Sequence, residues 1–223
     1  MHPAFLPLFL LGALAAPGAS AASCDAYASD LAAMAGADQA LRKRIDFLNQ
    51  HTPEQQSNLQ HLGLVDRTNT ERLKSWVARC GWPDKARDGD QAAGHAWLLT
   101  QHADHDRPFQ KRMLALIEAA AAKAGEGVGK NFAYLYDRIA VAEQRPQHYG
   151  TQFAGAGSRP CELDFAPMDD RAKVEERRKA IGLMPLEAYR RLMREMQHCP
   201  VDVASGQPNA DYHYAPPAGG IKP

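Results

Sequence analysis

The chain has 223 residues, and its 26 lysines and arginines are balanced by 26 aspartates and glutamates, giving a formal net charge of +0 at pH 7. Nucleic acids and anionic membrane surfaces attract proteins through excess positive charge, so the composition argues against either as the main partner. No stretch reaches the ~20 consecutive apolar residues that a membrane-spanning helix needs. A soluble chain with small-molecule or peptide partners is therefore expected.

Residues 1–21 contain no Asp, Glu, Lys or Arg, carry the apolar run FLPLFLLGALAA and end in Ala19-Ser20-Ala21. This pattern is typical of a secretory signal peptide. We expect cleavage near Ala21 or Ala22 and an exported mature chain, periplasmic or secreted. The alternative is lipid anchoring at Cys24, although Ala21 stands where a lipoprotein signal has Leu.

The mature chain is long enough to bury one core, so a single domain is expected over residues 22–199. Residues 200–223 are rich in Pro, Gly and small polar residues and predict a disordered tail. The 4 cysteines follow one another at spacings of 56, 81 and 38 residues, which match no zinc pattern. In an oxidising compartment they predict two disulfides. Spacing does not fix the pairing, and we favour Cys24–Cys80 with Cys161–Cys199 because each ties an end segment to a nearby one.

The predicted elements are helices. From Cys24 to about Gln50, apolar residues recur at steps near three, four and seven, which is helical periodicity. Thr70 precedes a helix that Gly81 and Pro83 stop. Further helices are predicted around residues 95–102, from Asp106 into the alanine run, and at about 130–143, 169–181 and 185–197. The fold class is therefore predominantly all-α, one irregular multi-helix domain.

The stretch HAWLLTQHADHDRPFQ contains the strongest candidate site residues. His95 and His102 are seven positions apart and share one helix face, but a spacing of roughly 10 Å is too long for both to bind one metal ion. His102 and Asp104 lie where the helix ends and are expected in a polar cleft or in pairs. His95 is expected to lie behind the site or to be structural, and Asp106 is explained as a helix cap.

A second polar group follows in YLYDRIAVAEQRPQHYGTQ. Asp137 and Arg138 lie on a predicted helix, and the loop after it is dense in hydrogen-bonding side chains, namely Gln147, Tyr149, Thr151 and Gln152. Two alternatives stay open for this group: a solvated pair beside a loop braced by its own side chains, or part of a ligand site.

These segments together resemble a bacterial helical domain family of unknown function, with similarity over about residues 80–192. The resemblance implies a helical domain with signature positions at Gln101, His102, Asp104, Gln110, Asp137, Arg138, Gln147, Tyr149, Gly150 and Gln152. It implies no particular activity.

Two functions remain from the sequence. In the first, the domain binds a small molecule or peptide, or stabilises its own packing, through one site lined by His102, Asp104, Asp137 and Arg138. In this hypothesis Gln101, Gln110, Gln147, Tyr149 and Gln152 contact the ligand. In the second, the same His, Asp and Arg residues form a hydrolase-like site, with a divalent metal ion or with a histidine base oriented by aspartate. Whether these residues bind a metal ion would distinguish the hydrolase hypothesis from the binding hypothesis.

Overall fold

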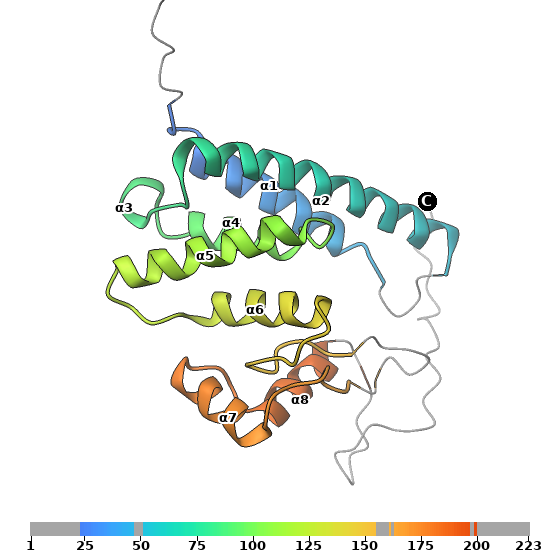
Figure 1. Cartoon of the computed structure of the whole chain (residues 1–223). Helices are drawn as coiled ribbons and strands as arrows, with labels where there is room; N and C mark the ends of the chain where they lie inside the picture. Colours follow the sequence, from blue (N-terminus) through green and yellow to red (C-terminus); the bar gives the residue numbers. More distant parts are fainter. Residues whose placement is uncertain (1–22, 47–50, 155–160, 162, 197–198, 200–223) are drawn as a thin grey trace, which may run out of the picture.

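The computed structural model describes residues 23–46, 51–154, 161, 163–196 and 199. Within these residues the chain forms eight helices and no strand, so the predicted all-α fold class is confirmed. The predicted signal peptide at 1–21 and the predicted tail at 200–223 lie outside the described residues. The helices are stacked in layers, with α1 and α2 at one end of the molecule and α7 and α8 at the other (Figure 1).

Helices α1 (Tyr27–Arg42) and α2 (Pro53–Cys80) form the first layer. Helix α2 begins where Thr52 accepts a hydrogen bond from the backbone of Gln55, and Pro53 occupies the first turn. It is therefore much longer than the helix predicted after Thr70. The Thr70 hydroxyl donates instead to the carbonyl of Asp66, one turn back within the same helix.

Helices α3 (Lys85–Asp88), α4 (Ala92–Gln101) and α5 (Arg107–Lys123) follow. Helix α4 packs against both α1 and α2, and α5 packs against α4 on one side and α6 on the other. Asp106 caps α5 by accepting a hydrogen bond from the backbone of Phe109 at 2.9 Å, as predicted. The largest core cluster joins these layers and contains Tyr27, Leu31, Met34, Leu73, Cys80, Ala92, Ala96, Leu99, Ala103, Phe109 and Met113.

Helices α6 (Lys130–Ala142), α7 (Arg171–Ala180) and α8 (Leu186–Met196) complete the described elements. A loop of residues 147–153 lies between α6 and the last two helices (Figure 1). Isolated bridges join Gln147 to Met168 and Phe153 to Phe165, so the loop pairs with the segment that leads into α7.

Two disulfides join Cys24 to Cys80 and Cys161 to Cys199, with Cα atoms 6.0 Å and 5.6 Å apart. This is the pairing that the sequence analysis favoured. Across the described ranges, no helix has the length and apolar character needed to cross a membrane.

Candidate functional site

His102 directs its ring towards α1. It is the residue at which α4 ends, and its Nδ1 lies 3.0 Å from Oδ1 of Asp38 and 3.1 Å from Nε of Arg42. Asp38 and Arg42 are one turn apart on α1, and the Asp38 side chain is fully buried. The turn after α4 thus brings His102 to a buried carboxylate from the first helix.

Asp66 of α2 completes this group. Nη2 of Arg42 donates to Oδ1 of Asp66 at 2.7 Å, while Nε of Arg42 donates to Asp38 at 3.1 Å. One ligand atom from each of Asp38, Asp66 and His102 lies within 4.8 Å of the other two. We call these three residues the Asp38–Asp66–His102 cluster. The side chains of Asp66 and His102 are each 16% exposed, so the cluster is accessible from one edge.

The electrostatics of the cluster favour a cation. Two carboxylates face one guanidinium, and burial, together with the neighbouring Asp38, raises the pKa of Asp66. Burial also acts to raise the pKa of Asp38, but the hydrogen bond and charge of His102, with help from Gln39 and Arg42, lower it below its usual value. Asp38 is therefore held as an anion in the core of the cluster.

Asp104 points away from this cluster, towards α6. Arg138 donates to both carboxylate oxygens of Asp104, with Nε 2.7 Å from Oδ1, and Nε2 of Gln110 donates to Oδ1 at 3.3 Å. Nη1 of Arg138 also donates to Oε1 of Gln152 at 3.5 Å. The Asp104 and Arg138 side chains are 50% and 33% exposed, so this two-point ion pair joins the α4–α5 turn to α6 at the surface.

Asp137 is directed from α6 towards the loop of residues 147–153 and is fully buried. Its carboxylate accepts hydrogen bonds from the backbone N–H groups of His148, Tyr149 and Thr151, and from the Thr151 hydroxyl. Burial raises the pKa of Asp137, and the three backbone hydrogen bonds partly offset this effect. Asp137 therefore organises the loop and faces no open site.

Gln147 also braces the loop. Its Nε2 donates to the carbonyls of Gln152 and Ala166, and its Oε1 accepts from the backbone of Gln152 at 2.7 Å. The backbone carbonyl of Tyr149 accepts a hydrogen bond from Arg178. These contacts show that the loop is braced by its own side chains, and the full burial of Asp137 shows that Asp137 is not part of a solvated pair.

The structure separates the predicted site residues into two groups. His102 joins Asp38 and Asp66. In the other group, Asp104 and Gln110 are connected through Arg138 and Gln152 to the loop that Asp137 and Gln147 organise. Among the described residues, no hydrogen bond connects His102 with Asp104, Asp137 or Arg138. His95 and Gln101 each bury one side-chain atom, Nδ1 and Oε1, that has no hydrogen-bond partner.

Asp38, Arg42 and Asp66 were not singled out from the sequence, although a signal was present. Asp38 falls on the buried stripe of α1, between Met34 and Ile45, at a position where the helical period calls for an apolar residue. A buried carboxylate at such a position needs a partner. The polar interruption of an apolar stripe was the clue to this cluster.

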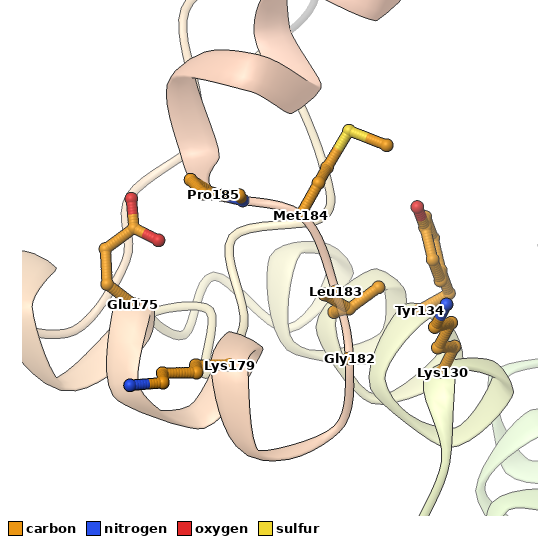
Figure 2. Close-up of a pocket in the computed structure, with 8 residues that line it drawn as sticks. All are labelled: Lys130, Tyr134, Glu175, Lys179, Gly182, Leu183, Met184 and Pro185. Carbon is orange, nitrogen blue, oxygen red and sulfur yellow. The ribbon is translucent and has the colours of Figure 1, made fainter.

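A separate cavity of about 690 Å³ lies between α6 and the α7–α8 turn. Figure 2 shows Lys130 and Tyr134 on one side of the 182–185 segment, with Glu175 and Lys179 on the other. The two lysine side chains extend in different directions and do not converge on one point (Figure 2). No predicted site residue lines this cavity.

The fold and the polar cluster define an all-helical protein in which α1, α2 and the end of α4 share a buried acidic group with one histidine. A family model described as a family of unknown function, DUF6624, matches residues 25–201, and the chain belongs to this family. The match includes α1 and α2, so it extends beyond the resemblance over about residues 80–192. Searches of curated proteins and of solved structures each found no match.

Proposed function

We propose that this chain is an exported metal-binding protein in which Asp38, Asp66 and His102 bind one divalent cation. The observation that carries the proposal is the convergence of their three ligand atoms within 4.8 Å. They come from three different helices, and two of the three side chains reach solvent at one edge. One imidazole nitrogen with two carboxylate oxygens suits ions such as Zn²⁺ or Mn²⁺.

The hydrogen bonds around His102 are compatible with a bound cation. With the proton on Nδ1, His102 donates to Oδ1 of Asp38 at 3.0 Å, and Nε of Arg42 donates to the same carboxylate at 3.1 Å. A divalent cation in the place of this proton would be bound by lone pairs of both His102 and Asp38.

Arg42 holds the position of a counter-cation between the two aspartates. A divalent ion would displace the Arg42 guanidinium, because both cations bind the carboxylate oxygens of Asp38 and Asp66. The Arg42 side chain is 21% exposed and can turn towards solvent. Its removal should therefore strengthen metal binding.

A metal titration of the purified mature protein tests this function. We expect calorimetric binding of Zn²⁺ or Mn²⁺ in which His102→Ala and Asp38→Asn each weaken affinity by about tenfold or more, and Arg42→Met strengthens it. His105→Ala is the matched control, because His105 is exposed and three residues from His102. Arg138→Ala should leave the metal affinity unchanged. If Arg138 and His102 instead lined one common site, this variant would bind the metal more weakly. Equal affinity in wild type and His102→Ala would contradict the proposal.

Metal-assisted hydrolysis is a second candidate function. Three protein ligands leave a coordination position for water, as in catalytic rather than structural zinc sites. The partial exposure of Asp66 and His102 supports an open position on the accessible side of the cluster. Turnover of simple ester or phosphoester substrates that depends on both the added metal and His102 would support this candidate over binding alone.

Export is proposed from two independent features. Two disulfides suggest an oxidising environment, and residues 1–21 have the pattern of a signal peptide. The intact mass of protein recovered from the periplasm or medium should correspond to a chain that begins close to Ala22, with both disulfides formed. A soluble cytoplasmic form that keeps residues 1–21 and four free thiols would contradict export.

A further inference from the structure

An apolar groove runs between α2 and α5, on the side of α5 that faces away from α6. Its first stretch, of about 580 Å³, is lined by Lys74, Val77, Ala78, Phe109, Arg112, Met113, Ala115 and Leu116. Its second stretch, of about 450 Å³, is lined by Trp82, Pro83, Asp84, Leu116, Ala119, Ala120, Lys123 and Ala124. Leu116 belongs to both, so the two stretches adjoin.

Helix α5 has two apolar faces. Leu114 and Ile117 pack with Phe132 of α6 in the second core cluster. Phe109, Met113 and Leu116, at steps of four and three, lie on the groove instead. From Phe109 to Lys123 this face extends for about 21 Å at the helical rise per residue. The groove is therefore long, and apolar residues line most of it.

The charged residues that line the groove at its Phe109 end are both basic. The two charged residues of the first stretch are Lys74 and Arg112, whose cationic groups lie 5.7 Å and 5.9 Å from the centre of the Phe109 ring. Lys74 is neutralised by Asp106 and Glu71, each at 2.6 Å. Arg112 forms no ion pair with any described residue. The nearby carboxylate of Asp106 is already paired with Lys74, and the second stretch has one charge of each sign, Asp84 and Lys123. Arg112 therefore favours a ligand whose anionic group lies at the Phe109 end of the groove.

We propose that this groove binds a single-chain anionic amphiphile, a fatty acid, with its carboxylate at Arg112 and its alkyl chain along Val77, Met113 and Leu116. The volumes of the two stretches lie in the range of small-molecule sites, roughly 300 to 1,000 Å³. The site shares no residue with the Asp38–Asp66–His102 cluster.

Binding of laurate to the mature protein, measured by calorimetry, tests the proposal. We expect laurate to bind, and dodecanol and dodecyltrimethylammonium, which lack the anionic end, to bind at least roughly tenfold more weakly because they form no charge-assisted hydrogen bond with Arg112. Arg112→Gln should remove this preference for laurate. Lys111→Gln is the control, since the neighbouring Lys111 is exposed and pairs with Glu143 on the α6 side.

A second variant tests the path of the alkyl chain. Ala119 is exposed on the groove, so Ala119→Trp should fill the second stretch and weaken binding of palmitate more than binding of the shorter decanoate. An unchanged helical circular dichroism spectrum would show that the variant folds. Equal affinity of wild type and Arg112→Gln for laurate would overturn the proposal. So would tight binding of an acidic amphipathic helical peptide that laurate fails to displace.

Discussion

Asp137 and Arg178 are two buried charges that contact the same loop without contacting each other. Asp137 accepts from the backbone N–H groups of His148, Tyr149 and Thr151. Arg178, which is 1% exposed, donates to the carbonyls of Tyr149 and Gly150 at 2.7 Å and 3.0 Å. The backbone between them is thus bound on both sides, and the two charges compensate the polar groups that a buried loop leaves open.

Replacement of Asp137 should therefore destabilise the protein by more than the loss of one hydrogen bond would. Asp137→Ala leaves several buried donors without an acceptor, and we expect a loss of about 3 kcal/mol or more in the free energy of unfolding. Urea denaturation measures it. Asp90→Ala, at an aspartate paired with Lys85 in an exposed ion pair, is the control and should change stability by less than about 1 kcal/mol. Equal effects of the two substitutions would contradict this role.

Asp38 should make stability depend on pH. Burial acts to raise its pKa, but His102, Gln39 and Arg42 together lower it below the usual value. A carboxyl group with a lowered pKa in the folded state stabilises the protein above its unfolded pKa, near 3.9, and loses this contribution as the pH falls further through the folded pKa. Urea midpoints measured from pH 6 to pH 3 should therefore fall more steeply for wild type than for Asp38→Asn. Parallel curves would show that Asp38 does not contribute.

At the scale of elements, the loop of residues 147–153 depends on Gly150. Gly150 has a φ of +63°, and a Cβ there would lie 2.6 Å from Cδ2 of Leu186 on α8. The loop backbone therefore lies directly against α8, at a distance that only glycine permits.

Gly150→Ala should lower the free energy of unfolding by roughly 2 kcal/mol or more, because it combines a left-handed backbone conformation with overpacking. Gly94→Ala is the matched control. Gly94 lies within α4 with nothing near its missing side chain, so alanine should stabilise that helix by up to about 1 kcal/mol. Thermal unfolding should show a lower melting temperature for Gly150→Ala and an unchanged or higher one for Gly94→Ala. A Gly150→Ala protein as stable as wild type would show that α8 can move aside.

Sequence patterns predicted most helices because their ends carry clear signals, such as Asp106 before α5 and Gly81 after α2. They missed the first half of α2 because its buried face includes Asn58 and Asn69, which weaken the apolar period. The sequence pointed to His102, but not to Asp38 and Asp66, which the structure places beside it. Side chains two positions apart, such as His102 and Asp104, point to different helices, and only the packing of α1 and α2 shows which partners they meet.

At the scale of the whole molecule, the disulfides close the two ends of the domain. Cys24 precedes α1 and is joined to the last residue of α2, while Cys161 is joined to Cys199 after α8. Replacing both cysteines of either bridge with serine should lower the free energy of unfolding by about 2 to 4 kcal/mol, mainly through the unfolded chain. Denaturation of each double variant measures it. If neither double variant is less stable than wild type, packing without the disulfides is sufficient to hold the two ends of the domain in place.

The order of the bridges also bears on how the protein matures. Each disulfide joins cysteines that are consecutive in the chain, the first with the second and the third with the fourth. On the proposed export route, Cys24 and Cys80 both enter the oxidising compartment before Cys161 emerges. An oxidase that joins cysteines in their order of arrival would then make both native bonds directly. We therefore expect this chain, unlike a protein with interleaved bridges, to form its disulfides without an isomerase.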